Sequence, residues 1–279
     1  MKTRLTILCE NSVGHHPTDI IGEHGFSCFL ETDNGNYLFD TGQGFSIIQN
    51  AMALNIDLRT IDAIMISHGH YDHTGGLPAV LKVKGVVDVY AHNDIFARRI
   101  SSKNGVSRDI GIPYRRHYLE SLGARFKLGF QMVETGPGVY LTGEIPRQSS
   151  FEKDDPNMTL ITSDGQRIHP DPLLDDLSLV VETEKGLIIV LGCAHAGMIN
   201  IINYVIKQLS NDHIFAIIGG THLGFATDRQ FDETLKVIDK YKIEHIGVSH
   251  CTGLEKAALL HAHLGNRFFF GSVGAVLEG

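Results

Sequence analysis

Short apolar runs, rich in valine and isoleucine and separated by polar turns, recur along most of the chain. Runs of this length with few interior charges are typical of strands that are covered on both faces. The pattern therefore predicts buried strands at residues 5–8, 26–31, 37–39, 61–66, 86–90, 187–191, 214–218 and 243–248.

The last third of the chain alternates these strands with amphipathic helices. Helical spacing of apolar residues predicts helices at 198–209, 229–241 and 254–264. Thr227 and Gln230 are placed as a capping box for the second helix, and Gly265 ends the third. A final strand is expected at 268–270, which makes the fold class a layered α/β protein.

The chain of 279 residues is predicted to form a single domain over 1–279. Residues from about 93 to 172 are less periodic and rich in proline and turn signals, such as the Gly-Pro-Gly at 136–138. This stretch is expected to be an insertion or lid within the domain rather than a linker.

The amino-acid composition indicates which class of protein the chain belongs to. Hydrophobic residues make up 43% and charged residues 20% of the chain, as in ordinary globular proteins. A net charge of −8 disfavours binding to nucleic acid, and no apolar stretch is long enough to span a membrane. The four cysteines show no CxxC spacing, which favours reduced thiols in a cytoplasmic protein. Oligomeric state is not readable from the sequence.

The densest chemical signal follows the strand at 61–66. There the motif HxHxDH places His68, His70, Asp72 and His73 within six residues. In an extended turn His68 and His70 face the same way and are able to share one ion. Asp72 and His73 are adjacent and diverge, which favours a second ion.

Three later histidines also follow predicted strands: His195, His222 and His250. Because ligands gather at the carboxyl ends of strands in open α/β sheets, these side chains are expected to converge. Asp40 follows another strand, and it either orients a ligand histidine by a hydrogen bond or opens an Asx turn before Gly42.

With HxHxDH after a strand, Asp-Thr-Gly at 40–42 and later strand-end histidines, the chain resembles the metallo-β-lactamase superfamily over nearly its whole length. The resemblance implies a four-layer αβ/βα sandwich and a pair of metal ions, with Asp40 orienting a ligand. The implied ligands of the first ion are His68, His70 and His195, and those of the second are Asp72, His73 and His250.

The chain departs from that superfamily at the fourth motif. Most members have an aspartate there that bridges the two ions, whereas residues 219–222 offer His222. A neutral imidazole donates through one nitrogen and does not bridge as a carboxylate does. Three alternatives follow: His222 binds one metal, it contacts substrate, or the second site is weak. Asp72 and His222 are the candidate catalytic residues.

Four further segments, at 24–27, 141–147, 192–197 and 250–253, resemble a subgroup of that superfamily. The subgroup includes the dihydropterin ribofuranosylaminobenzene-phosphate synthase of the methanopterin pathway and many uncharacterised hydrolase-like proteins. It implies that His24 contacts substrate, the alternative being a plain surface loop. Arg147 either clamps a phosphate or forms a surface salt bridge.

Two pairs of residues near the motifs are expected to be structural. Cys193 and Cys251 flank the site and are expected to be buried as small apolar side chains rather than to act as thiolate ligands. Asp175 and Asp176 precede an apolar run and are expected at a solvated strand start.

The leading functional hypothesis is a dinuclear metal-dependent hydrolase. Two ions about 3.5 to 4 Å apart lower the pKa of a shared water toward roughly 7 and so supply hydroxide at neutral pH. The excess positive charge of such a site favours a small anionic substrate, a phosphorylated or ester-containing metabolite. Imidazole-rich ligation favours zinc, with iron or manganese as alternatives.

Two other functions stay open. One is a transferase that condenses a pterin pyrophosphate with a ribofuranosylaminobenzene phosphate, as the subgroup resemblance implies. The other is a metal-containing binding or sensing module in which the substitution at His222 leaves one metal site empty.

Overall fold

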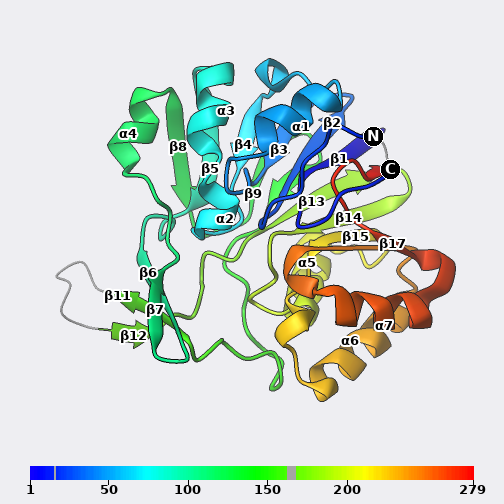
Figure 1. Ribbon diagram of the computed structural model, residues 1–279. Helices are drawn as coiled ribbons and strands as arrows, with labels where there is room; N and C mark the ends of the chain where they lie inside the picture. Colours follow the sequence, from blue (N-terminus) through cyan, green and yellow to red (C-terminus); the bar gives the residue numbers. More distant parts are fainter. Residues whose placement is uncertain (16, 162–167) are drawn as a thin grey trace.

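The computed structural model describes residues 1–15, 17–161 and 168–279, whose strands form two large sheets and one small sheet (Figure 1). The strands of the first sheet run in the order β18 Val276–Glu278, β1 Thr3–Cys9, β2 Ser27–Thr32, β3 Gly35–Phe39, β4 Ala63–Met65, β5 Val87–His92 and β8 Ala124–Gly129. Those of the second run in the order β17 Phe268–Phe270, β16 His245–Ser249, β15 Ile214–Gly220, β14 Gly186–Leu191, β13 Ser178–Thr183, β10 Val139–Leu141 and β9 Val133–Gly136.

Seven α-helices connect the strands within the described residues. They are α1 Ile47–Ala53, α2 Tyr71–Thr74, α3 Leu77–Lys84, α4 Arg116–Ser121, α5 Met198–Leu209, α6 Asp228–Lys240 and α7 Leu254–Leu264. Short 3₁₀ turns lie at Leu58–Thr60, Leu223–Phe225, His250–Thr252 and Gly265–Arg267. Thr227 caps α6 as the sequence predicts, because its Oγ1 accepts a hydrogen bond from the backbone N–H of Gln230 at 3.2 Å.

Three hydrophobic clusters show that the molecule has four layers. The middle cluster contains residues of β1 to β4 together with residues of β13 to β15, so the two large sheets pack face to face. A second cluster joins the first sheet to α1, α3 and α4, and a third joins the second sheet to α5, α6 and α7. The expected four-layer αβ/βα sandwich is therefore confirmed.

The strand β14 shows how sequence produces these layers. Side chains alternate between the faces of a strand, so an uninterrupted apolar run serves two cores at once. Leu187, Ile189 and Leu191 face the helices, whereas Ile188 and Val190 face the other sheet. All five residues are fully buried. The strand is therefore held on both sides by apolar contacts.

The region from about 93 to 172 has a mixed structure. Its central strands β8, β9 and β10 belong to the two large sheets. Its flanking parts form a separate four-stranded sheet in the order β12 Ile168–Pro170, β11 Met158–Ile161, β6 Arg98–Lys103 and β7 Val106–Asp109. Figure 1 shows this small sheet projecting from one side of the sandwich. A role as a lid stays a prediction.

The predicted site residues follow the carboxyl ends of parallel strands in both large sheets. The strands β3, β4, β5 and β8 are parallel in the first sheet, as are β14 to β17 in the second. Asp40 and the HxHxDH motif follow β3 and β4, and three histidine-bearing loops follow β14, β15 and β16. The fold thus brings residues far apart in sequence to one edge. No helix within the described residues combines the length and apolar character needed to cross a bilayer.

Candidate metal centre

The first imidazole of the HxHxDH motif is oriented by a chain of hydrogen bonds. Ser67 Oγ donates to Asp40 Oδ2 at 2.7 Å and lies 2.8 Å from His68 Nδ1. A hydroxyl has a single proton, and here it goes to the carboxylate, so Nδ1 of His68 carries the proton it shares with Ser67. The other ring nitrogen, Nε2, therefore carries the lone pair of the ring.

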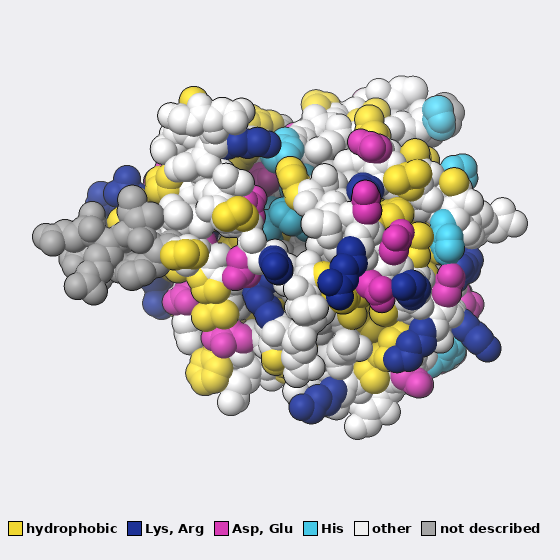
Figure 2. Space-filling model, turned by 90° about the horizontal axis from the view of Figure 1, so that it is seen from below, with side chains coloured by type: hydrophobic (Ala, Val, Ile, Leu, Met, Phe, Trp, Pro, Cys, Tyr) yellow, Lys and Arg dark blue, Asp and Glu magenta, His cyan; other side chains and the backbone are white. Residues whose placement is uncertain are grey.

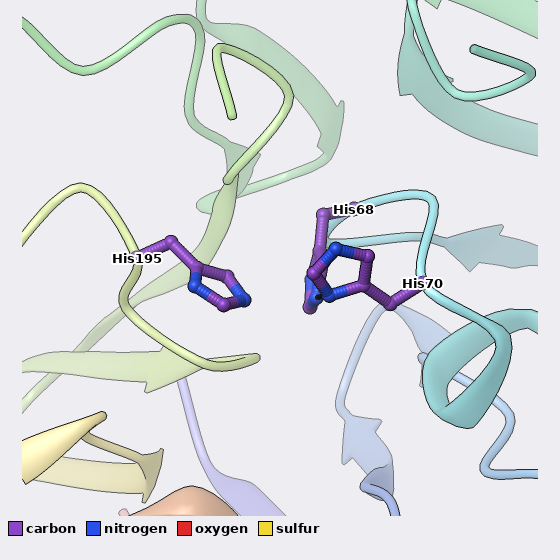
Figure 3. Close-up of side chains that lie close together, drawn as sticks. All are labelled: His68, His70 and His195. Carbon is purple, nitrogen blue, oxygen red and sulfur yellow. Dashed lines mark hydrogen bonds between the residues drawn. The ribbon is translucent and has the colours of Figure 1, made fainter. Parts of the chain in front are cut away.

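His68, His70 and His195 converge on one point. Their ring nitrogens lie within 4.8 Å of one another, and His68 Nε2 is 2.9 Å from His70 Nδ1. Figure 3 shows the three rings facing each other, with His195 on the opposite side from the other two. His195 comes from the loop after β14, where Ala194 adopts a left-handed φ of +56°.

Burial keeps these three imidazoles neutral. It lowers the pKa of His68 and of His195 well below the usual value and that of His70 to about 3. The buried Nε2 atoms of His70 and His195 have no hydrogen-bond partner among the described residues. Neutral rings with unpartnered nitrogens are the form in which histidine binds a transition metal, so the donor set fits a metal ion.

His73 is held by Asp40. Its Nδ1 lies 2.6 Å from Asp40 Oδ2, and both side chains are fully buried. Burial alone would lower the pKa of His73, but the neighbouring carboxylate of Asp40 raises it to about 9. Because Nδ1 is engaged by Asp40, Nε2 is the nitrogen turned toward the site, where it lies 3.2 Å from Cys193 Sγ.

A second group contains Asp72, His250 and His24. Asp72 Oδ2 lies 3.3 Å from His250 Nε2 and 3.1 Å from His24 Nε2. Although burial would raise it, the hydrogen bonds from the two histidines hold the pKa of Asp72 well below its usual value. Asn11 Oδ1 accepts from His250 Nδ1 at 3.0 Å, which leaves Nε2 facing Asp72. His24, predicted to contact substrate, therefore lies against a predicted metal ligand.

His222 lies beside the first group. Its ring centroid is 4.4 Å from that of His195, and its buried Nδ1 has no hydrogen-bond partner among the described residues. The residue has a left-handed φ of +55° and lies two positions after the end of β15. One of its ring nitrogens comes within 4.8 Å of the donor atoms of Cys193 and His195. Its part as a metal ligand or catalytic residue stays a prediction.

A cavity of about 350 Å³ opens beside this cluster and is partly lined by His195 and His222. Figure 2 shows histidine side chains inside a hollow near the middle of the lower face. Arg147 also lines the cavity, where it pairs with Asp154 at 3.0 Å and donates to the carbonyls of His195 and Pro172. The salt bridge is thus present, and a contact of Arg147 with substrate stays a prediction.

Comparisons with known proteins agree with this geometry. The family model described as the metallo-beta-lactamase superfamily matches residues 21–209, which is more than half of the chain. The chain belongs to the metallo-β-lactamase superfamily. Its membership accounts for the four-layer sandwich and for histidines gathered at the strand ends of both sheets.

A related archaeal protein matches most of this metallo-β-lactamase chain. It is the 7,8-dihydropterin-6-methyl-4-(beta-D-ribofuranosyl)-aminobenzene-5'-phosphate synthase of Methanocaldococcus jannaschii, 30% identical over 266 residues. The match covers 90% of this chain and 88% of the synthase. The resemblance inferred from the motifs is therefore confirmed.

Two solved structures share the metallo-β-lactamase fold. One, described as a metal-dependent hydrolase of the beta-lactamase superfamily, matches with a TM-score of 0.85 and 24% identity over 99% of each chain. The other is the metallo-beta-lactamase fold protein YhfI of Bacillus subtilis, with a TM-score of 0.59 and 11% identity over the full length of both chains. At these identities the two matches establish the fold alone.

Two acidic residues near the centre differ from the sequence-based expectation. Asp175 and Asp176 were expected at a solvated strand start, and this is wrong because both are fully buried. Asp175 accepts from Arg99 Nη2 at 2.7 Å and from the backbone N–H of Gly69 at 2.8 Å, within the HxHxDH motif. Asp176 accepts from the backbone N–H of Ala196 at 2.8 Å, next to His195. Each carboxylate therefore anchors a loop of the metallo-β-lactamase site.

Cys193 is the other residue whose surroundings the sequence did not reveal. It is buried, as expected, but its neighbours are imidazoles and not an apolar core. Its position two residues before a strand-end histidine was the available signal, because such loops carry the ligands in this superfamily.

Proposed function

We propose that this chain is a dinuclear metal-dependent hydrolase that acts on a small anionic metabolite carrying a phosphate or another ester. The observation that carries the proposal is the convergence of His68, His70 and His195. Their ring nitrogens lie within 4.8 Å of one another, and the buried Nε2 of His195 has no partner among the described residues. Because His195 also lines the cavity, a substrate there reaches the cluster.

The residues that would hold two metal ions divide into two sets. We assign His68, His70 and His195 to the first, with His222 beside them, and Asp72, His73 and His250 to the second. Asp72 and His250 lie together with His24, whereas the donor atom of His73 lies within 4.8 Å of those of His68 and Cys193. When bound, a pair of zinc ions supplies Lewis-acid activation of water and of the ester bond. Iron and manganese are the alternatives for an imidazole-rich site.

The protein's own contribution to this activity is orientation. Asp40 engages Nδ1 of His73 directly and holds His68 through Ser67, so that Nε2 of both rings faces the site. Such outer hydrogen bonds fix the ring and its tautomer before a ligand arrives. Burial at the same time keeps water away from the imidazoles and strengthens their interaction with a cation.

The preference for an anionic substrate rests on charge at the bottom of the cavity. Two divalent ions held by neutral histidines and the single carboxylate of Asp72 would leave an excess of positive charge there. The cavity wall itself carries both signs of charge, with Arg147 and Lys153 beside Glu152, Asp154 and Asp155, so the preference depends on the two ions. We infer that phosphate or carboxylate groups enter it, and that nucleic acid and membranes are not partners.

Metal analysis together with turnover tests the proposal. We expect a His68→Ala/His70→Ala double variant to lose bound zinc and any turnover of a panel of phosphate mono- and diesters. His117→Ala replaces an exposed histidine of α4 and serves as the matched control. Unchanged zinc content in the double variant would sink the metal assignment. Full zinc content in the wild-type protein without turnover on any ester would favour the binding or sensing module.

A transferase is the second candidate function, because the archaeal relative that matches 90% of this chain is named as a synthase. In that case the same metal centre would stabilise a departing pyrophosphate while a second substrate attacks. Product formation measured with and without an aromatic amine acceptor separates the two candidates. Product that forms only when the acceptor is present assigns the transferase, whereas release of phosphate in water alone assigns the hydrolase.

A further inference from the structure

The side chain of Cys193 occupies a central position in the histidine cluster. It is 4% exposed and lies in the loop after β14, two residues before His195. Its Sγ is 3.2 Å from Nε2 of His73, a residue of the opposite sheet's motif. The thiol therefore lies between residues that come from the two large sheets.

Among the described residues, Cys193 takes part in more of the potential metal-binding groups than any other side chain. Its Sγ lies within 4.8 Å of donor atoms in three separate groups, which are His68 with His73, His195 with His222, and His250 with Cys251. These partners come from both of the ligand sets assigned above. A single sulfur near all of them is within reach of both predicted ligand sets.

We propose that Cys193 is a thiolate ligand of this metal centre. The inference rests on the proposed metal site and adds a ligand to it. Zinc binds imidazole nitrogen at about 2.0 to 2.1 Å and thiolate sulfur at about 2.3 Å, so two ligand atoms on one tetrahedral ion are roughly 3.5 Å apart. The separation of 3.2 Å between Sγ and His73 Nε2 is close to this distance.

A thiolate would add negative charge to a site that has few anionic ligands. The segment Gly219 to His222 offers an imidazole where a bridging carboxylate would carry negative charge, so the centre has few anionic ligands. A bound cation stabilises a coordinated thiolate, and the thiolate in turn supplies the negative charge that this centre otherwise lacks. On binding, the S–H bond breaks, the S–metal bond forms with the same electron pair, and the proton leaves to solvent.

Cys251 provides a matched control close to the same site. Its sulfur accepts the backbone N–H of His222 at 3.2 Å and lies 3.5 Å from the carbonyl oxygen of Cys193. It belongs to one of the potential metal-binding groups, compared with three for Cys193. We therefore expect Cys251 to hold the backbone around the site without binding the metal.

The decisive experiment detects sulfur at the metal directly. Wild-type protein, Cys193→Ser and Cys251→Ser are loaded with zinc and measured by X-ray absorption, and loaded with cobalt(II) and measured by near-ultraviolet absorption. We expect wild type and Cys251→Ser to show a sulfur scatterer at about 2.3 Å and a sulfur-to-cobalt charge-transfer band. Both signals should be absent from Cys193→Ser, which should keep zinc on His68, His70 and His195.

Each other outcome overturns the proposal. The proposal is wrong if wild-type protein binds zinc without a sulfur scatterer. It is also wrong if the sulfur signal persists in Cys193→Ser or disappears in Cys251→Ser. If Cys193→Ser does not fold, wild type and Cys251→Ser still decide, since only Cys193 among the cysteines near the site remains in the latter. Failure of the wild-type protein to bind zinc at all would instead overturn the proposed function.

Discussion

Asp40 Oδ2 lies 2.6 Å from Nδ1 of His73, and the same oxygen accepts the hydroxyl proton of Ser67 at 2.7 Å. Ser67 in turn contacts His68 Nδ1, so one carboxylate oxygen orients the first and last histidines of the HxHxDH motif. Asp40 follows β3 with a left-handed φ of +57°, a conformation that aspartate tolerates better than most residues. Aspartate therefore suits this position both because it tolerates the left-handed backbone conformation and because its carboxylate accepts the hydrogen bonds.

Replacing Asp40 by asparagine should weaken metal binding without removing a ligand. The amide has one acceptor oxygen in place of two, so it does not satisfy His73, Ser67 and the backbone N–H of residue 67 together. We expect zinc affinity to fall roughly 10- to 100-fold, measured by competition with a chromophoric chelator. Asp62→Asn, at a carboxylate that binds the backbone N–H of Asn36, is the control and should keep wild-type affinity. Equal affinities in the two variants would contradict this role for Asp40.

A buried cluster of charged side chains connects the small sheet to the HxHxDH motif. Arg99 of β6 is 1% exposed and donates to Asp171 at 2.8 Å and to Asp175 at 2.7 Å. The second oxygen of Asp175 accepts from the backbone N–H of Gly69. Removal of the arginine would leave two buried carboxylates without their cation.

For this reason Arg99→Ala should be strongly destabilising. We expect the free energy of unfolding to fall by about 3 to 5 kcal/mol, measured by urea denaturation followed by circular dichroism. Arg98→Ala, which removes an exposed side chain paired with Asp109 at 3.4 Å, should change it by less than about 0.5 kcal/mol. Similar losses for the two variants would refute a special role for the buried cluster.

The elements that the sequence predicted well are those with a strong internal pattern. The helices at 198–209 and 254–264 are found with the expected bounds, and every predicted strand is present within a few residues. In these segments the apolar spacing by itself specifies which faces are buried. The strands of the small sheet were not predicted, because β6 and β7 are short and largely polar and pair through backbone hydrogen bonds.

The site was predictable to the extent that its residues stand in a local motif or directly after a strand. The sequence indicated the histidines and Asp40 in this way. Arg99 and Asp175 were not predictable, because their pairing joins positions 76 residues apart and depends on how the small sheet packs. The expected burial of Cys193 is confirmed, but the sequence did not show that imidazoles surround it, since an isolated cysteine carries no information about which loops lie nearby.

Gly25 controls the position of Asp72. It has a φ of +135°, and a Cβ added there would lie 2.2 Å from the carbonyl oxygen of Asp72. Gly25→Ala should therefore push Asp72 away from His250 while leaving the first ligand set intact. We expect bound zinc to fall from about two toward one ion per chain, measured by atomic emission after dialysis. Gly129→Ala, where an added Cβ meets nothing within 4 Å, should retain the wild-type content, and an equal loss there would remove the argument.

Asp176 should make the stability of the metal-free protein depend on pH. Burial raises the pKa of its carboxyl group from 3.8 to about 6. Between these values the folded protein holds a proton that the unfolded chain has released, so the contribution of Asp176 to stability is fully present below about pH 4 and is lost as the pH rises through about 6. A difference of about two pKa units corresponds to a loss on the order of 3 kcal/mol.

Asp176→Asn keeps an oxygen that can accept from the backbone N–H of Ala196 but has no titrating proton. We therefore expect the variant to lose less stability than wild type between about pH 4 and pH 7, in urea denaturation with a chelator present. Asp232→Asn, on the exposed face of α6, should follow the wild-type curve. Other carboxylates titrate in the same range and affect all three proteins alike, so the difference between the curves isolates Asp176. Parallel curves for Asp176→Asn and wild type would show that the buried carboxyl group does not retain its proton.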